Sequence, residues 1–267
     1  MRRMLTAVAL VLAGGGSAAA ATVDGANIHW TSRGSGQQAV IFVHGWTCDD
    51  SSWQGQVPAI SRTRRVITLD LPGHGRSGMP KNGFSMELFA RAVEAVRAEA
   101  KIDRAVLVGH SMGTPVIRKY ALMYPDRVAG LVIVDGLIQI ADGSAAGPQP
   151  RPVSGPAREN MIRGMFSDIT TPALQQHIVK MMMGAPEQTA AGAMVATWDR
   201  SQWSNDPIKA PTLAVYAGSR PLSNEPAVKR LYPAAEYHQI PQTGHFLMME
   251  KPEEFNALLT RFLDRIR

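Results

Sequence analysis

Short apolar runs rich in Val, Ile and Leu recur along the chain, and segments of helical periodicity separate them. Each run is nearly continuous rather than alternating, which is typical of strands covered on both faces. The runs lie at residues 39–43, 65–69, 105–109, 129–134 and 211–217. The clearest helical pattern between them covers 86–100, where apolar residues recur every three or four positions. The alternation predicts a mostly parallel central sheet with helices on both faces.

Weaker patterns extend this prediction toward both ends of the chain. Residues 26–32 are read as one edge strand, and residues 236–240 as the last strand. A final helix is expected to open at Lys251-Pro252, because proline is tolerated in the first helical turn. An apolar stripe at helical spacing then predicts that one face of this helix is buried.

The stretch from 137 to 206 departs from this alternation. Residues 141–156 are rich in Gly, Pro, Ala and Ser and are expected to form a loop, whereas helical patterns cover 158–166, 172–183 and 186–198. These helices carry Met161, Met165, Met181, Met182, Met183 and Met194. The methionines either pack the helices onto the core or line an adaptable apolar pocket, because methionine fits varied apolar shapes.

The first residues have the pattern of a secretory signal peptide. Arg2 and Arg3 precede an apolar run from Met4 to Ala13, and a Gly-rich and Ala-rich tail follows with A-x-A-type cleavage sites. We therefore expect residues 1–21 to be a signal peptide and the protein to be exported, to the periplasm or the medium. The apolar run is too short to span a membrane, and no stable membrane insertion is expected after the signal is removed.

Composition narrows the remaining classes. About 245 residues after the signal suit one domain, and 45% hydrophobic residues suffice for a large core. The net charge of +6 comes from scattered residues without interleaved aromatic side chains, which argues against nucleic-acid binding. Cys48 is the only cysteine, so no intramolecular disulfide can form, and neither HExxH nor CxxC occurs to suggest a metal site. The oligomeric state is left open.

One segment carries recognisable chemistry. Gly109-His110-Ser111-Met112-Gly113 fits G-x-S-x-G, between a predicted strand and a predicted helix. Such a tight turn exposes the serine hydroxyl at a helix N-terminus, where the backbone N–H of Met112 is free to face a developing oxyanion. Ser111 is therefore the candidate nucleophile, and Met112 supplies a candidate oxyanion-hole N–H group.

With its flanking strand and helix, this motif resembles the nucleophile turn of the α/β-hydrolase superfamily, of the esterase and lipase-like serine-hydrolase kind. The resemblance covers most of the chain from Val23 onward, except the central stretch. It implies the α/β-hydrolase fold, with a core at 22–136 and 207–267 and an inserted helical lid at 137–206. In this family an H-G-x segment supplies the second oxyanion donor, which here is the backbone N–H of Trp46 after His44-Gly45. The catalytic histidine is implied to be His245, in a G-H-F context after the last strand.

A second glycine motif has two readings. Gly73, Gly75 and Gly78 spell G-x-G-x-x-G after a strand, as in a dinucleotide site, but no helix begins at Gly78. The segment instead resembles the D-x-P-G-x-G-x-S turn of the family. Asp70 and His74 are then structural residues.

The triad acid is not in its usual place. Pro221 stands where the family's commonest arrangement has an aspartate, in Gly218-Ser219-Arg220-Pro221. Asp135 ends the strand after the nucleophile strand, and some members of the superfamily carry the acid there. Glu225 lies farther along, at a helix start that favours a solvated carboxylate. We expect Asp135 to be the acid, with Glu225 or no acid as the alternatives.

Together these features predict an exported serine hydrolase that cleaves a carboxylic ester or a related acyl bond through an acyl-enzyme. Its partner is a small ester-like molecule, and no cofactor is required. A lactonase, a thioesterase and a C–C bond hydrolase remain alternatives, because a serine nucleophile suits each of them. A ligand-binding protein that keeps the fold without catalysis is the alternative from another class.

Overall fold

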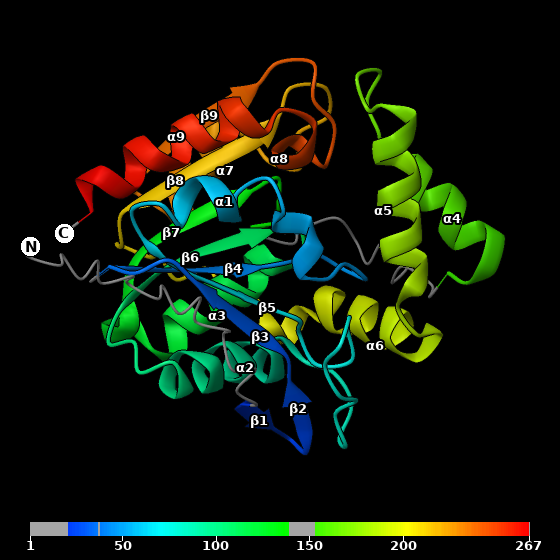
Figure 1. Cartoon of the computed structure of the whole chain (residues 1–267), viewed down its shortest axis with the longest axis horizontal. Helices are drawn as coiled ribbons and strands as arrows, with labels where there is room; N and C mark the ends of the chain where they lie inside the picture. Colours follow the sequence, from blue (N-terminus) through cyan, green and yellow to red (C-terminus); the bar gives the residue numbers. More distant parts are fainter. Residues whose placement is uncertain (1–20, 37, 139–152, 267) are drawn as a thin grey trace, which may run out of the picture.

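A seven-stranded sheet forms the centre of the computed structural model, which describes residues 21–36, 38–138 and 153–266 (Figure 1). Its strands, in spatial order, are β3 (Trp30–Arg33), β5 (Arg65–Leu69), β4 (Ala39–Val43), β6 (Ala105–His110), β7 (Val128–Val134), β8 (Thr212–Ala217) and β9 (Ala235–Ile240). Only β3 runs antiparallel to its neighbour; the other neighbouring strands of this sheet are parallel. The predicted mostly parallel sheet is thus confirmed.

Helices cover both faces of this sheet, which explains the continuous apolar runs. Every residue of β4, β6, β7 and β8 is buried. On one face α2 (Met86–Glu99) packs against α3 (Gly113–Met123), and on the other α1 (Val57–Ile60) packs against α9 (Pro252–Arg265) (Figure 1). Ser85 caps α2, since its hydroxyl accepts a hydrogen bond from Leu88 N at 3.0 Å.

The single edge strand predicted over 26–32 is wrong, because two strands share this segment. β1 (Ala21–Val23) pairs with β2 (Ala26–Ile28) in a separate hairpin, while β3 belongs to the main sheet. Asp24 and Gly25 form the hairpin loop with φ of 48° and 76°. A two-residue hairpin loop of this kind needs left-handed backbone at both positions. The pair of residues was a readable turn signal.

Three helices form an insertion between β7 and β8, and we call residues 153–206 the helical insertion. They are α4 (Gly155–Arg163), α5 (Pro172–Gly184) and α6 (Glu187–Trp198). They lie beyond the carboxyl ends of the parallel strands, at the right of Figure 1. Most of the loop expected over 141–156 falls outside the described residues.

The remaining helices are short. The chain also contains α7 (Glu225–Leu231) and α8 (Leu247–Glu250), with 3-10 turns at η1 (Asp50–Trp53), η2 (Pro125–Arg127) and η3 (Arg200–Gln202). The helix start expected at Glu225 is confirmed by α7, whereas α8 was not predicted. The four residues of α8 are too few to show a helical period in the sequence.

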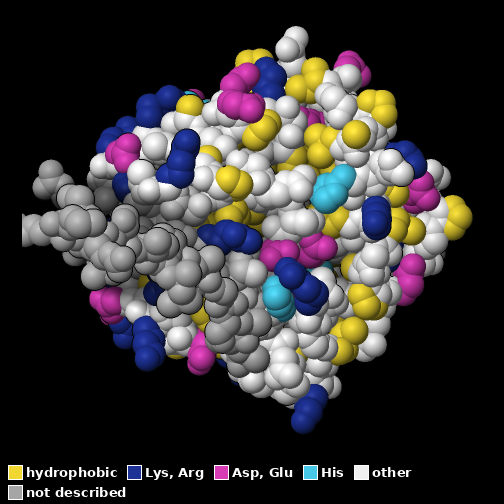
Figure 2. Space-filling view, in the orientation of Figure 1, with side chains coloured by type: hydrophobic (Ala, Val, Ile, Leu, Met, Phe, Trp, Pro, Cys, Tyr) yellow, Lys and Arg dark blue, Asp and Glu magenta, His cyan; other side chains and the backbone are white. Residues whose placement is uncertain are grey.

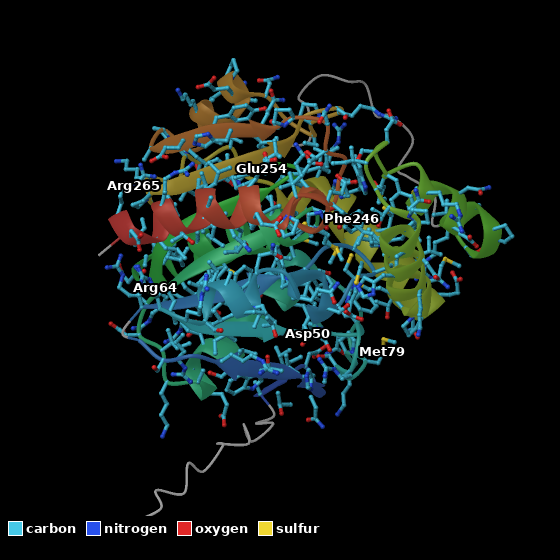
Figure 3. The ribbon with its side chains drawn as sticks, turned by 45° about the horizontal axis from the view of Figure 1, so that its top comes forward. Asp50, Arg64, Met79, Phe246, Glu254 and Arg265 are labelled. Atoms are coloured by element: carbon cyan, nitrogen blue, oxygen red, sulfur yellow. The ribbon has the colours of Figure 1, made fainter. Side chains whose placement is uncertain are left out.

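The two ends of the sheet differ in their surroundings. In Figure 3 Phe246 lies on the side of the helical insertion, whereas Arg64 and Arg265 lie at the opposite end of the sheet. Arg64 pairs with Asp264 at 2.8 Å, and Arg265 pairs with Glu236 at 2.7 Å. Figure 2 shows Lys and Arg side chains spread over one face among Asp and Glu. Across the described ranges no helix is long and apolar enough to cross a membrane.

The predicted signal peptide lies outside the described residues, apart from Ala21. The structure places Ala21 in β1, opposite Ile28. The predicted boundary between residues 21 and 22 therefore falls within a strand.

Candidate active site

The turn between β6 and α3 holds Ser111 in strained backbone. Ser111 has φ of 53°, in the left-handed region that side chains other than glycine rarely adopt. A Cβ on Gly109 would collide with the carbonyl oxygen of Gly113, and one on Gly113 would collide with the carbonyl oxygen of Val43. The two glycines of the motif are therefore required by close backbone contacts, and the strand-to-helix turn predicted for the motif is present.

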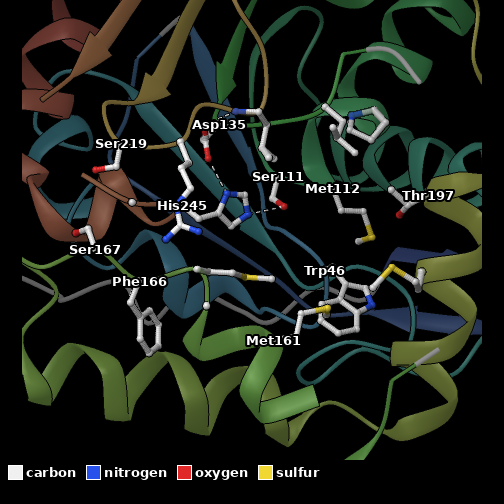
Figure 4. Close-up of a pocket in the computed structure, with 18 of the residues that line it drawn as sticks. Trp46, Ser111, Met112, Asp135, Met161, Phe166, Ser167, Thr197, Ser219 and His245 are labelled. Atoms are coloured by element: carbon white, nitrogen blue, oxygen red, sulfur yellow. Dashed lines mark hydrogen bonds and ion pairs between the residues drawn. The ribbon is translucent and has the colours of Figure 1, made fainter. Parts of the chain in front are cut away.

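The side chains of Ser111, His245 and Asp135 form one chain of hydrogen bonds (Figure 4). His245 Nδ1 lies 2.7 Å from Asp135 Oδ2, and His245 Nε2 lies 2.8 Å from Ser111 Oγ. Because a carboxylate only accepts, Nδ1 carries the proton and Nε2 is left to accept from the serine hydroxyl. The structure brings together the three side chains that the sequence analysis selected from separate segments.

The carboxylate of Asp135 accepts hydrogen bonds from the neighbouring strand β8 and from the loop after β8. Its side chain is 1% exposed. Oδ1 accepts hydrogen bonds from Ala217 N at 3.2 Å and from Leu222 N at 3.3 Å, which leaves Oδ2 for His245. These two donors belong to β8 and the loop after it, the segment where the commonest family arrangement carries the acid. The backbone of that loop thus orients a carboxylate that comes from β7.

Glu225 has a different environment. It is the first residue of α7, and its carboxylate pairs with Lys229 at 2.7 Å. The Glu225 side chain is 50% exposed. Within the described residues it forms no hydrogen bond or ion pair with His245. Of the two candidate acids, the geometry connects only Asp135 to the histidine.

Trp46 and Met112 both line the cavity that contains Ser111. Neither backbone N–H donates a hydrogen bond to another described residue, so both are available to a ligand oxygen. A Cβ on Gly45 would lie 3.0 Å from Ser111 Cβ, which shows how closely the loop after β4 approaches the serine. The loop that carries Trp46 and the serine turn that carries Met112 are therefore adjacent.

The histidines of the neighbouring loops make structural hydrogen bonds, as was expected for His74. His44 Nε2 accepts from Leu71 N at 2.9 Å, and its Nδ1–H donates to the Gly45 carbonyl at 2.8 Å. Both ring nitrogens are thus occupied, and the bond of Nε2 joins the two loops. Burial lowers the pKa of His74 to about 3, which keeps that ring neutral.

His110 has a role that the sequence analysis missed. Its Nε2–H donates to the carbonyl oxygen of His245 at 2.9 Å, and the two rings lie 4.8 Å apart. Burial holds the pKa of His110 well below its ordinary value. A variable position of the G-x-S-x-G motif therefore fastens the loop of His245 to the serine turn. Only the identity of the residue, a histidine beside the serine, could have drawn attention to it.

A cavity of about 570 Å³ opens above the hydrogen-bonded chain. This volume is within the range of small-molecule sites, which is about 300–1,000 Å³. Its lining is mainly apolar and aromatic: Trp46, Met112, Pro115, Leu137, Met161, Met165, Phe166, Met194 and Trp198. Polar groups enter it from Ser167, Asp168, Thr197, Ser219 and Arg220. Figure 4 shows Met161 and Trp46 across the cavity from Ser111.

The two readings of the methionines each hold for part of the set. Met161, Met165 and Met194 line the cavity. Met181 and Met182 are buried in the core instead, and Met183 packs against it. The sulfur of Met181 accepts hydrogen bonds from the hydroxyls of Ser51 and Ser52, both at 3.4 Å. Helical spacing alone could not separate the two groups, because it marks an apolar face but not what that face contacts.

The helical insertion also holds Trp46 through its side chain. Trp46 Nε1–H donates to the carbonyl oxygen of Ala190 in α6 at 2.8 Å. The guanidinium of Arg158, from α4, lies 5.8 Å from the centre of the Trp46 ring. Arg158 is 1% exposed and donates to the carbonyl oxygens of Met182 and Ala185 at the end of α5. Helices α6 and α4 thus contact Trp46 directly, and α5 holds Arg158 in place.

The described residues contain no group of three or more His, Cys, Asp or Glu side chains that could hold a metal ion. The polar side-chain atoms of Ser111, His245 and Asp135 instead form hydrogen bonds with one another. The arrangement can activate a hydroxyl, hold an imidazolium and offer two N–H groups to an oxyanion.

Comparison with known proteins agrees with this geometry. Residues 38–219 match the family profile described as alpha/beta hydrolase fold. The chain is 28% identical, over 88% of its length and 90% of the relative's, to a 2-hydroxy-6-oxononadienedioate/2-hydroxy-6-oxononatrienedioate hydrolase of Paraburkholderia phymatum.

Two solved structures share both the fold and recognisable sequence. One is a thermophilic esterase from Thermogutta terrifontis, with a TM-score of 0.82, 26% identity and coverage of 92% of this chain and 97% of the esterase. The other is an N-acyl homoserine lactone degrading enzyme, with a TM-score of 0.77, 28% identity and coverage of 91% and 100%. The protein therefore belongs to the α/β-hydrolase fold family and is a serine hydrolase.

Proposed function

We propose that the protein hydrolyses carboxylic esters through a triad of Ser111, His245 and Asp135. The observation that carries the proposal is the unbroken hydrogen-bond chain from Asp135 through His245 to Ser111, at 2.7 and 2.8 Å, on the floor of an apolar cavity. An ester has the carbonyl that this chain can attack and a leaving group that needs one proton.

In this mechanism Ser111 Oγ attacks the ester carbonyl carbon while His245 Nε2 takes the hydroxyl proton. Asp135 keeps the Nδ1 proton in place and stabilises the imidazolium. The N–H groups of Trp46 and Met112 hold the oxyanion. The imidazolium then protonates the departing alcohol, and the acyl group stays on Ser111. Water, deprotonated by His245, releases the acid and restores the serine.

The cavity lining supports an apolar acyl group. The wall is mostly apolar and includes several methionine and aromatic side chains, and apolar groups gain by leaving water. Methionine side chains adapt to varied shapes. We therefore propose a substrate with an uncharged acyl chain.

A lactone is the second candidate substrate. The observation in its favour is the N-acyl homoserine lactone degrading enzyme, which shares 28% identity across 91% of this chain. A lactone is a cyclic ester, so the same bonds form and break, with the alcohol retained in the product.

One experiment tests the proposal and separates these substrates. We expect the protein to turn over p-nitrophenyl esters of graded acyl length, and Ser111→Ala to abolish turnover. A serine-directed phosphonate should modify Ser111 in the folded protein, as peptide mapping would show. Inclusion of lactones in the substrate panel ranks the two candidates. Absence of both turnover and Ser111 modification, with a ligand bound intact, would instead support a non-catalytic binding protein.

We also propose that the protein is exported. The support is the basic, apolar and Ala-rich pattern of residues 1–21. Mass spectrometry of the protein from its native host should find an N-terminus between Ala19 and Val23. Soluble protein that retains Met1 would contradict export by this signal.

A further inference from the structure

Glu250 joins the loop of the candidate catalytic histidine to the helical insertion. It is the last residue of α8 and is half-buried. Its Oε2 accepts a hydrogen bond from Gly244 N at 2.6 Å. Its Oε1 accepts one from the Ser167 hydroxyl at 2.9 Å and another from the Thr170 hydroxyl. One carboxylate therefore ends three hydrogen bonds, which come from two segments far apart in the sequence.

The two segments are in close contact where Glu250 joins them. Gly244 directly precedes His245, and residues 165–170 connect α4 to α5 in the helical insertion. His245 N donates to the Met165 carbonyl at 3.1 Å. A Cβ on Gly244 would lie 2.8 Å from that carbonyl oxygen and 2.9 Å from Ser167 N, so only glycine fits without a shift. The backbone of the histidine loop thus rests directly on the insertion.

A carboxylate suits this position better than other side chains. It has two acceptor oxygens and no donor, so it can accept from the Gly244 N–H on one side and from hydroxyls on the other. Hydrogen bonds to a charged acceptor are about twice as strong as neutral ones. The junction is thereby held more firmly than by the backbone contact alone.

The consequence for catalysis follows from the position of His245. Its ring must reach Ser111 Oγ and Asp135 Oδ2 at once, and both are anchored by the sheet. The ring itself is on a loop outside the sheet. A misplacement of about 1 Å in such a constellation can cost about 100-fold in rate. The contacts that hold Gly244 therefore help to set the position of the His245 ring relative to Ser111 and Asp135.

We propose that Glu250 is a positioning residue that holds His245 in register by fastening its loop to residues 165–170 of the helical insertion. The inference rests on the proposed function of Ser111 and His245. It makes the insertion part of the catalytic framework, in addition to its contribution to the cavity wall. Glu250 itself is outside the residues that line the cavity.

Glu250→Ala, Glu250→Gln and the control Glu253→Ala test this role. Glu253 is exposed on α9, and its removal changes the net charge equally. We expect Glu250→Ala to lower kcat about 10- to 100-fold with KM within about twofold, because only positioning is lost. Glu250→Gln should recover most of the loss, since its amide can accept from Gly244 and donate to a hydroxyl. Glu253→Ala should match the wild type.

Hydrogen exchange at the Gly244 amide supplies a readout that is independent of turnover. We expect exchange at Gly244 to accelerate in Glu250→Ala but not in Glu253→Ala. Wild-type protein that neither turns over esters nor labels at Ser111 would disprove the proposed function, while the exchange result would still report on the Glu250 link. Unchanged kcat in Glu250→Ala, a loss confined to KM, or unchanged Gly244 exchange would overturn the inference.

A second variant guards against unfolding of Glu250→Ala. Thr170 is 4% exposed, and Thr170→Val removes its hydroxyl from Glu250 while keeping the side-chain shape. We expect a several-fold fall in kcat and faster exchange at Gly244, with secondary structure retained by circular dichroism. Wild-type values for both in a folded Thr170→Val protein would refute the link from the side of the insertion.

Discussion

Asp135 and Glu225 are both carboxylates, and their positions in the fold distinguish them as candidate triad acids. The chain offers two carboxylates near the expected place, and both are charged and at element ends. Asp135 is 1% exposed and has its second oxygen occupied by Ala217 N and Leu222 N. Glu225 is half-exposed and paired with Lys229. Only the buried carboxylate meets the imidazole.

The first prediction compares these two carboxylates. Asp135→Asn should fold normally and lose about 10²–10⁴ in kcat, because an amide allows the wrong histidine tautomer. Glu225→Gln should leave kcat nearly unchanged, since an exposed ion pair contributes about 0–1 kcal/mol. The measurement is kcat on a p-nitrophenyl ester, with circular dichroism as the control for folding. A reversed pattern would move the acid to Glu225, and normal activity in both variants would mean that His245 needs no carboxylate.

At the scale of elements, both the sheet and the helical insertion position the residues of the candidate site. The carboxyl ends of β6 and β7 carry Ser111 and Asp135, as expected for ligand sites of parallel sheets. The loops that carry Trp46 and His245 are outside the sheet. Each is held by a hydrogen bond to the insertion, Trp46 through Ala190 and His245 through Met165.

The second prediction tests the Trp46 contact. Trp46→Phe keeps the backbone N–H and an aromatic ring but removes the indole donor to Ala190. We expect kcat to fall about fivefold, the equivalent of one hydrogen bond of about 1 kcal/mol. Trp203→Phe is the matched control, because Trp203 Nε1–H donates to the Thr197 carbonyl at 2.9 Å without lining the cavity. Equal kcat in the two variants would show that the hydrogen bond to Ala190 does not help to position the loop that carries the Trp46 N–H group.

For the whole molecule, buried histidines link stability to pH. His74 and His110 are fully buried and neutral, and burial lowers the pKa of His74 to about 3. An unfolded histidine has a pKa of about 6.5. Between these values the unfolded chain binds a proton that the folded protein excludes. The contribution to stability is therefore complete above about pH 6.5 and is lost as the pH falls toward the folded pKa.

The third prediction concerns the slope of this loss. From pH 6 to pH 4 His74 should reduce the free energy of unfolding by up to about 1.4 kcal/mol per pH unit. His74→Phe should fold with its aromatic contact to Phe89 and show a smaller slope than the wild type. Urea unfolding across this pH range measures both slopes. Parallel curves for the two proteins would mean that His74 takes up its proton without unfolding.

Local patterns were sufficient for most of the elements and for the candidate nucleophile Ser111. The apolar runs predicted the buried strands because a strand covered on both faces needs apolar residues at every position. The turn around Ser111 was readable because G-x-S-x-G is a short motif, although the contact that requires Gly113 comes from Val43, far away in the sequence. His245 was reachable because its loop resembles that of the family. The hairpin turn at Asp24-Gly25 also has a local sequence signal, although the prediction was a single strand over 26–32.

The tertiary structure decided what depends on segments far apart in the chain. It places Asp135 within hydrogen-bond distance of His245, because β8 and its following loop supply the backbone donors that orient the carboxylate. It divided the methionines between core and cavity. The sequence could not predict this division, because helical periodicity indicates an apolar face but not what that face contacts. It joined Glu250 to Ser167 and Thr170 across 83 and 80 positions of sequence. Such contacts arise from the packing of whole elements, so no local spacing records them.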